Sequence, residues 1–362
     1  MHKIDRTNNF DLIRLLAALQ VLIWHGCKHF EGMFDAFYPL LVILYSLPGV
    51  PIFFTISGFL IYYSLQNNRG SLRKYFTNRF LRIYPALWLC ISMTIVLIIT
   101  SSSISLNEFF SFSFLKWLVA QFTFFQFYTI DLFRSWGVGH PNGSLWTITV
   151  EIQFYIALPI IALIFDKFTA KKWHKNVLYI SLALVSLFLK ILFYESGAFD
   201  NPLVQNLFGV TILNYFYHFC LGVLIYINFD VLKRFLVGKA LWWVILYAVF
   251  ILLFKETLGW YDSVYDTGLL SVLANILLSF LTISAAFTLP KLSEKMVRGN
   301  DLSYGIYIFH MPIFNFYLAM GLMINTVTFL AVCLSVIFVA FLSWKYVEKP
   351  ALQLKKVKTL RT

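Results

Sequence analysis

The first apolar stretch of the chain, from Phe10 to His25, contains two residues whose side chains can take part in binding or catalysis, Arg14 and His25. If the stretch is an α-helix, the eleven-residue step between them makes about three turns and places both on one face, roughly 16 Å apart. A guanidinium binds phosphate oxygens bidentately, and a neutral imidazole accepts a proton from a hydroxyl. Because polar groups are costly inside a bilayer, the pair indicates a functional site.

Other polar residues interrupt apolar stretches elsewhere in the chain. Arg79 and Arg82 stand at the start of a predicted third span, where they are expected at the same inner level as Arg14. Glu151 enters a predicted fourth span from the opposite side and should reach about the depth of His25. A carboxylate there can orient an imidazole and stabilise its cation. The two levels suit a long anionic donor whose head binds arginines while its reactive end reaches the histidine.

Each of these residues also has a structural interpretation, which the sequence leaves open. Arg14 and the other arginines can anchor the chain at a membrane interface, Arg14 as an ion pair with Asp11 three residues earlier. His25 can be a hydrogen-bonded core residue, and Glu151 one half of a structural ion pair. His310, inside a predicted ninth span, suits a structural role as well as a functional one.

The elements that must position these residues are membrane-spanning helices. The chain has 362 residues, of which 60% are hydrophobic and 13% charged, and no soluble core buries that much apolar surface. The apolar runs are about 18–22 residues long and unbroken, unlike the short alternating strands of a transmembrane barrel. The sequence therefore predicts an all-α polytopic membrane protein.

About ten spans are predicted from the apolar windows. They lie near residues 12–30, 44–66, 80–100, 146–165, 177–194, 209–229, 239–258, 268–288, 303–323 and 326–346. Most of the 29 basic residues fall in alternate connections and near both ends, which by the positive-inside rule places both termini in the cytoplasm. The net charge of +12 therefore reflects topology, and no nucleic-acid partner is expected.

One connection, residues 101–145, is long and extracytoplasmic in this topology. Its middle, from Phe114 to Tyr128, is apolar and aromatic but shorter than a span, which predicts an interfacial or re-entrant helix. Residues 1–350 then form one integral membrane domain and residues 351–362 a basic cytoplasmic tail. The four cysteines lack metal-ligand spacing, so no metal is expected.

The second predicted span contains a pair of small residues, Ser57 and Gly58, in the stretch FFTISGFLIYY. Small residues let a ligand or a neighbouring helix approach the backbone closely. Pro48 and Pro51, just before the pair, can bend the helix and open a groove. A ligand groove and simple helix packing are equally compatible with this pattern.

Taken in order, these stretches resemble the acyltransferase-3 family of integral membrane acyltransferases. The step from Arg14 to His25 matches the family's signature of an arginine, ten residues and a histidine. Further matching blocks are FFTISGFLI, NRFLRIYPALW, SLWTITVEIQFYIALP, SYGIYIFHMPIF and YVEKPAL. One block alone is a weak signal, but the ordered set spans nearly the whole chain and is specific.

The resemblance implies a bundle of about ten helices that moves an acyl group, commonly acetyl, from acyl-CoA to a sugar hydroxyl. The acceptor is a cell-surface glycan or its lipid-linked precursor. It also implies that His25 is required for transfer and that arginines hold the donor. The residues implied at the donor are Arg14, Arg79 and Arg82, and those on the acceptor side are Ser144, Trp146, Glu151 and Tyr155.

The resulting hypothesis is an acetyl-CoA-dependent O-acetyltransferase of the bacterial inner membrane that modifies a surface polysaccharide such as O-antigen. Its pantetheine arm is expected beside Ser57 and Gly58, and membrane lipids are further partners. His25 is expected to act as general base with Glu151 orienting it, or else to form an acyl-histidine intermediate. The alternative is a transporter that exports a sugar, lipid or small acid along buried charges. None of these patterns specifies the acceptor sugar or the oligomeric state.

Overall fold

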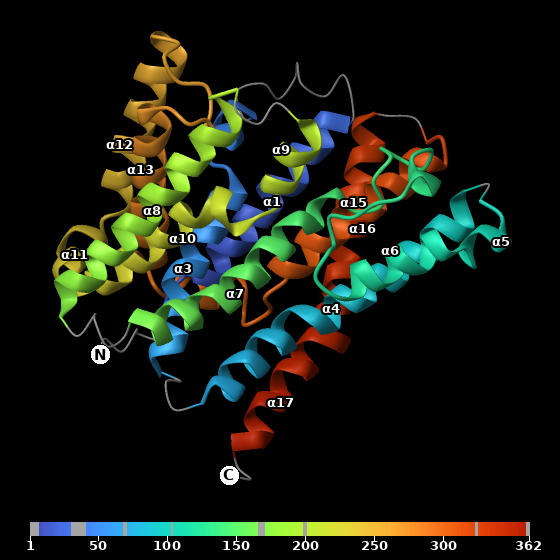
Figure 1. The fold of residues 1–362 in the computed structure, drawn as a ribbon, viewed down its shortest axis with the longest axis horizontal. Coiled ribbons are helices and arrows are strands. Elements are labelled where there is room, and N and C mark those ends of the chain that lie inside the picture. Colours follow the sequence, from blue (N-terminus) through green and yellow to red (C-terminus); the bar gives the residue numbers. More distant parts are fainter. Residues whose placement is uncertain are drawn as a thin grey trace. The chain divides into compact units, whose positions relative to one another are not determined.

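The structure, a computed structural model, is helical throughout the part of the chain that it describes (Figure 1). The described ranges are 7–29, 41–67, 71–102, 104–165, 171–197, 201–322 and 325–359, without the side chains of residues 29, 106 and 355–359. The first six residues, and residues 360–362 of the predicted basic tail, lie outside them. Within these ranges the predicted all-α class is confirmed.

Nine of the described helices are long and apolar enough to cross a membrane. They are Phe10–Lys28, Leu41–Asn67, Leu72–Ser101, Gly143–Phe165, Lys172–Tyr194, Pro202–Ile227, Ala240–Thr257, Leu269–Ala286 and Thr326–Leu354. The remaining predicted span, the ninth, is α15 (Ser303–Ala319), whose 17 residues fall just short of that length. It ends there because Gly321 adopts a φ of 62°, a left-handed conformation that terminates helices. The chain is a polytopic membrane protein.

The chain divides into two compact units, of which the first comprises Met1–Ala17, Tyr45–Leu72 and Gln153–Gly299. It contains the start of α1 (Phe10–His29) and the end of α7 (Trp146–Phe165). Its other helices are α3 (Gly49–Asn67), α8 (Lys172–Tyr194), α9 (Pro202–Phe208), α10 (Ile212–Ile227), α11 (Phe229–Leu236), α12 (Ala240–Ile251) with a π-helical end at Leu252–Thr257, α13 (Leu269–Ala286) and α14 (Leu292–Met296).

Helix α10 is the centre of the first unit and packs against α3, α8 and α13. Two glycines make the close contact with α3 possible. A Cβ on Gly58 would overlap the carbonyl oxygen of Phe219, and a Cβ on Gly222 would overlap that of Thr55. Since both obstacles are backbone atoms, neither position accepts a larger residue without separating the two helices.

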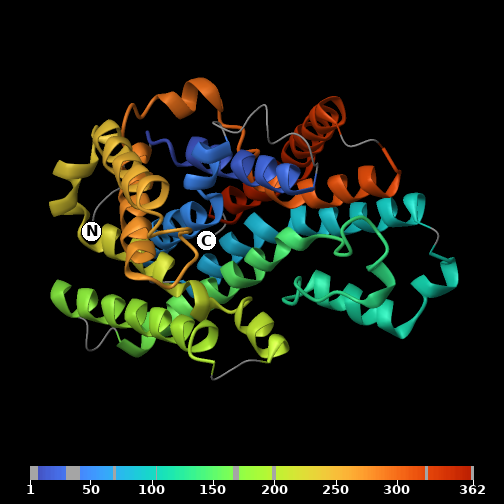
Figure 2. The same cartoon turned by 90° about the horizontal axis from the view of Figure 1, so that it is seen from above.

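The second unit comprises Ala18–Leu44, Arg73–Ile152 and Asn300–Thr362. It contains the end of α1 and the start of α7. Its other elements are α4 (Leu72–Ser101), α5 (Leu106–Phe109), α6 (Phe112–Phe122), 3-10 turns at Asp131–Phe133 and Gly143–Leu145, α15, α16 (Thr326–Ser343), a π-helical turn at Trp344–Glu348, and α17 (Lys349–Thr359). Helices α15 and α16 lie side by side in both views (Figures 1 and 2).

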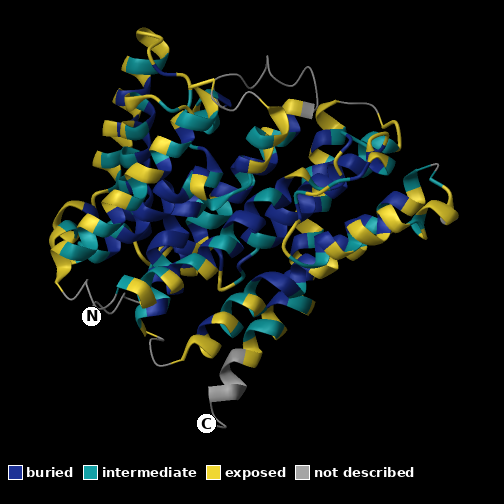
Figure 3. Cartoon of the chain, viewed as in Figure 1, coloured by how far each residue is buried: buried dark blue, intermediate teal, exposed yellow. Residues whose placement is uncertain are grey.

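The connection between α4 and α7 has its own small core in the second unit. Trp117 of α6 packs against Phe133, and Trp136 donates to the hydroxyl of Ser101 at 2.9 Å. The opposite side of α6 exposes apolar side chains such as Phe112 and Leu115, so the helix alternates between yellow and blue in Figure 3. A helix apolar on both sides suits a membrane interface, and that location stays a prediction.

Candidate active site

His25, near the end of α1, and His310, in the middle of α15, are in direct contact within the second unit. Nε2 of His310 lies 3.1 Å from Nδ1 of His25, and the two rings stack with centroids 4.9 Å apart. Nδ1 of His25 is also 3.1 Å from the carbonyl oxygen of Val21. Nδ1 of His310 is 3.3 Å from the carbonyl oxygen of Ile306. His310 is completely buried, and His25 is half-buried.

The end of α1 is fixed by close packing next to His25. A Cβ on the following residue, Gly26, would overlap the ring of Phe329 in α16. One turn earlier, the side-chain amide of Gln20 donates to the carbonyl of Leu44 at 3.0 Å. The small residue therefore lets α16 approach α1 directly beside the histidine.

Helix α15 is anchored through a proline that lies two residues after His310. Pro312 has no N–H, so the carbonyl of Ile308, four residues earlier, lacks its usual helical donor. The side-chain amide of Asn142 donates to this carbonyl at 2.8 Å, and Sγ of Cys90 lies 3.2 Å from it. The proline thus creates an acceptor that ties α15 to α4 and to the turn before α7.

Two further contacts hold the same turn against α15. The hydroxyl of Ser144 lies 3.3 Å from the carbonyl oxygen of Tyr307, and the hydroxyls of Thr147 and Tyr307 are 2.7 Å apart. Ser144, predicted on the acceptor side, is therefore buried and engaged in anchoring the turn. Trp146 begins α7 and is partly exposed, whereas Tyr155 is buried and belongs to the first unit.

Glu151 lies on the first part of α7, among aromatic residues of the second unit. It interacts electrostatically with the hydroxyls of Tyr75 and Tyr307. The guanidinium of Arg79 is 6.0 Å from the centre of the Tyr75 ring and interacts with the same hydroxyl. Glu151 and Arg79 therefore share Tyr75, at the start of α4, as a neighbour. Nδ1 of His25 is contacted by His310, and the expected role of Glu151 in orienting His25 stays a prediction.

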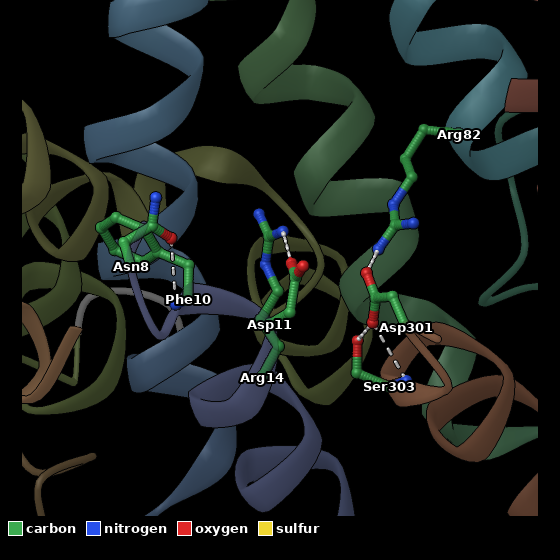
Figure 4. A network of polar contacts seen from close by, with 7 residues as sticks. All are labelled: Asn8, Phe10, Asp11, Arg14, Arg82, Asp301 and Ser303. Carbon is green, nitrogen blue, oxygen red and sulfur yellow. Dashed lines mark hydrogen bonds and ion pairs between the residues drawn. The ribbon is translucent and has the colours of Figure 1, made fainter. Parts of the chain in front are cut away.

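Arg82 of α4 forms an ion pair with Asp301, just before α15 (Figure 4). The other carboxylate oxygen of Asp301 accepts hydrogen bonds from the backbone N–H and hydroxyl of Ser303. Glu348 is also buried, interacts electrostatically with both members of the pair, and accepts a hydrogen bond from Ser343 at 3.0 Å. Arg82, predicted to bind donor phosphates, is thus paired with Asp301, and Glu348 lies nearby. We call Arg82, Asp301 and Glu348 the buried charge cluster.

Arg14 is placed in the first unit by the start of α1. The amide of Asn9 donates to the carbonyls of Thr288 and Leu289, which fixes the helix start against the turn after α13. Nη1 of Arg14 lies 3.9 Å from Oδ1 of Asp11, the ion pair that the sequence suggested (Figure 4). The side chain of Asp11 is half exposed, so this pair is loose and accessible.

Ser57 and Gly58, the predicted contacts of the pantetheine arm, are both buried in α3. The Cα of Gly58 faces the backbone of α10 at Phe219. Helix packing, one of the two interpretations left open by the sequence, accounts for the glycine.

Sequence reasoning missed Asn142, Asp301 and Glu348. Signals for each were present. Pro312 within a span predicts that Ile308 needs a substitute donor, and an aspartate directly before a span needs a partner when it is buried. Glu348 lies in the YVEKPAL block, which was noted only for its resemblance.

These features define a polytopic helical membrane protein with two histidines in contact and a buried charge cluster. The family model described as "Acyltransferase domain" matches residues 7–345. The chain therefore belongs to the acyltransferase-3 family, and the resemblance stated from its motifs is confirmed.

Two relatives align over nearly the full chain. Nodulation protein 10 of Rhizobium leguminosarum bv. viciae is 28% identical over 372 residues, covering 98% of this chain and 95% of the relative. An O-acetyl transferase of Shigella phage Sf6 is 27% identical over 368 residues, covering 96% of each. The peptidoglycan O-acetyltransferase OatA of Listeria monocytogenes is 27% identical over 173 residues, 46% of this chain and 25% of that protein. No solved structure matches the chain.

Proposed function

We propose that this protein transfers an acetyl group from acetyl-CoA to a hydroxyl of a bacterial surface polysaccharide or of its lipid-linked precursor. Membership of the family supports acyl transfer. Relatives named as an O-acetyl transferase and a peptidoglycan O-acetyltransferase support an acetyl group and a glycan acceptor. The observation that carries the chemistry is the hydrogen bond that joins Nδ1 of His25 to His310.

In the proposed reaction His25 is the general base. Its Nε2 takes the proton of the sugar hydroxyl while the oxygen attacks the carbonyl carbon of the thioester. The C–S bond then breaks, and the departing thiolate of CoA receives the proton from the imidazolium. An ester and free CoA result, and His25 returns to its neutral form.

Donor binding is assigned to the arginines, with Arg14 as the principal contact. A guanidinium and a CoA phosphate form charge-assisted, bidentate hydrogen bonds. Because α1 is one helix from Phe10 to His29, the axial distance from Arg14 to His25 is roughly 16 Å, of the order of an extended pantetheine. Arg79 is a second candidate, while Arg82 is already paired with Asp301.

The distribution of basic residues supports a protein of the bacterial inner membrane with both termini in the cytoplasm. Acetyl-CoA is made in the cytoplasm, so this orientation brings the donor to the end of α1 that carries Arg14. A reporter fused after residue 362 should be active only if it works in the cytoplasm. Activity of a periplasmic reporter at that position would reverse the orientation.

The direct test measures release of CoA from acetyl-CoA by the purified protein in lipid, with the surface glycan of the source bacterium as acceptor. His25→Ala should abolish release, and its thermal unfolding midpoint should stay near that of the wild type. His174→Ala, a change of a histidine in α8, is the matched control and should keep activity. Full activity of His25→Ala would show that His25 is not the general base. Movement of glycan across the membrane without dependence on CoA would favour a transporter.

A further inference from the structure

The contact between the two histidines assigns a role to the second one. We infer that His310 positions His25: it accepts a hydrogen bond from Nδ1–H of His25, keeps Nε2 of His25 unprotonated, and stabilises the imidazolium formed during transfer. This inference rests on the proposed general-base role of His25. His310 is a positioning residue, since it acts on the acceptor only through His25.

The protonation state of both rings follows from two backbone carbonyls. A carbonyl oxygen only accepts hydrogen bonds, so a ring nitrogen within bonding distance of it must carry the proton. The carbonyl of Ile306 meets Nδ1 of His310, and the carbonyl of Val21 meets Nδ1 of His25. Each carbonyl comes from the residue four positions before its histidine. Both neutral rings are therefore protonated at Nδ1 and carry a lone pair at Nε2.

With these tautomers the contact between the rings has one direction. Nδ1–H of His25 is shared between the carbonyl of Val21 and Nε2 of His310, each 3.1 Å away. The lone pair of Nε2 of His310 is the acceptor. In the reverse arrangement Nε2–H of His310 would donate to Nδ1 of His25, and the lone pair of each Nδ1 would then face a carbonyl oxygen. Nε2 of His25 is consequently the atom that takes the proton.

The arrangement matters most when His25 is protonated. Positive charge then spreads over its ring, and the hydrogen bond from Nδ1 becomes charge-assisted and stronger. His310 donates in turn to the carbonyl of Ile306, so the two consecutive hydrogen bonds polarise each other in the same direction. A buried carboxylate fills this place in a serine–histidine–aspartate triad. A neutral imidazole does so without an unpaired charge in the fully buried position of His310.

The anchoring of α15 keeps the hydrogen-bond acceptor, Nε2 of His310, in place. Asn142 holds the carbonyl of Ile308, and Thr147 bonds the hydroxyl of Tyr307, both within one turn of His310. Ring contacts with Tyr307 and Phe314 flank the imidazole on its own helix. The position of His310 is therefore set by neighbours that do not depend on His25.

Two substitutions of His310 separate the effect of its hydrogen-bond acceptor from the effect of its side-chain size. His310→Phe keeps a flat ring but removes the acceptor, whereas His310→Gln supplies an amide oxygen at a similar distance from the backbone. His310→Phe should lower kcat by about 10²–10³-fold, with a KM for acetyl-CoA within about threefold of the wild type, because donor binding is untouched. His310→Gln should recover kcat to within about tenfold of the wild type. Unchanged kcat in His310→Phe would overturn the inference.

A structural role for His310 is tested by weakening α15 elsewhere. Cys90→Ala removes the thiol that lies 3.2 Å from the carbonyl of Ile308, and touches neither imidazole. If His310 only stabilised the helix, Cys90→Ala with an equal drop in thermal midpoint should lose as much kcat as His310→Phe. We expect it to keep kcat near the wild-type value.

A spectroscopic measurement tests the hydrogen bond without any acetyl transfer. In wild-type protein carrying ¹⁵N-labelled histidine, His25 should show a protonated Nδ1 and an unprotonated Nε2 at neutral pH. Its signals are assigned by comparison with His25→Ala. The shift of Nδ1 should change in His310→Gln. An unprotonated Nδ1 would overturn the inference even in an active enzyme, whereas absent transfer with the expected spectrum would overturn only the proposed function.

Discussion

Two arginine–aspartate pairs of this protein look alike in composition but differ in environment (Figure 4). The side chains of Arg82 and Asp301 are 20% and 8% exposed, and Asp301 also accepts hydrogen bonds from Ser303. Arg14 is 22% exposed, much like Arg82, but its partner Asp11 is 51% exposed and lies 3.9 Å away on the same helix. The difference separates an arginine committed to the fold from one that can exchange its partner.

The energetics of ion pairs make this distinction quantitative. An exposed pair contributes about 0–1 kcal/mol, so a phosphate displaces Asp11 from Arg14 at little cost. Breaking a buried pair by removing one partner costs about 3–5 kcal/mol. A phosphate that recruited Arg82 would leave the buried carboxylate of Asp301 without its cation. Arg14 is therefore the better donor contact, although the sequence placed the arginines at one level.

The largest effect is expected from Asp301→Ala, which removes the partner of a mostly buried guanidinium and the acceptor for Ser303. The free energy of unfolding should fall by about 3 kcal/mol, the lower end for a broken buried pair, because the side chain of Arg82 is 20% exposed and keeps part of its hydration. The thermal unfolding midpoint in lipid measures the change. Asp11→Ala is the matched control. Equal shifts in the two variants would contradict the distinction between the pairs.

The fold was largely readable from the sequence, because each span is a long apolar run whose backbone must satisfy itself as a helix. The ten predicted windows all fall on helices, with α15 shorter since Gly321 ends it. The partners of the polar residues were less readable. His310 meets His25, and Asp301 meets Arg82, across more than two hundred residues of chain. Such pairings depend on how helices pack, which periodicity does not encode.

The next effect concerns the accessible pair. Arg14→Ala should raise the dissociation constant for acetyl-CoA by about tenfold to a hundredfold, equivalent to one or two charge-assisted hydrogen bonds. The thermal midpoint should stay near that of the wild type, since Arg14 supports little of the fold. Binding of acetyl-CoA to the protein in lipid is measured by calorimetry. Arg14→Lys keeps the charge without the planar fork and should recover part of the affinity. Normal affinity of Arg14→Ala for acetyl-CoA would show that Arg14 does not bind the phosphates of the donor.

A smaller effect is expected from Glu348→Gln. The amide oxygen can still accept from the hydroxyl of Ser343, while an ionisable group beside Arg82 is replaced by a neutral one. Because Asp301 remains, the free energy of unfolding should change by only about 1 kcal/mol. Affinity for acetyl-CoA should not change. Tighter donor binding in Glu348→Gln would show that Arg82 exchanges its carboxylates for phosphate, and would make the two pairs alike.

The smallest effect isolates the competition at Arg14. Asp11→Asn keeps the size of the side chain but removes the charge that shares the guanidinium. Affinity for acetyl-CoA should rise about twofold at low salt, and the gain should vanish as salt screens exposed charges. Stability should change by less than about 0.5 kcal/mol, as for other helix pairs three residues apart. Measured at two salt concentrations, weaker binding by Asp11→Asn would show that Asp11 orients Arg14 toward the donor, so that even the loose pair has a fixed geometry.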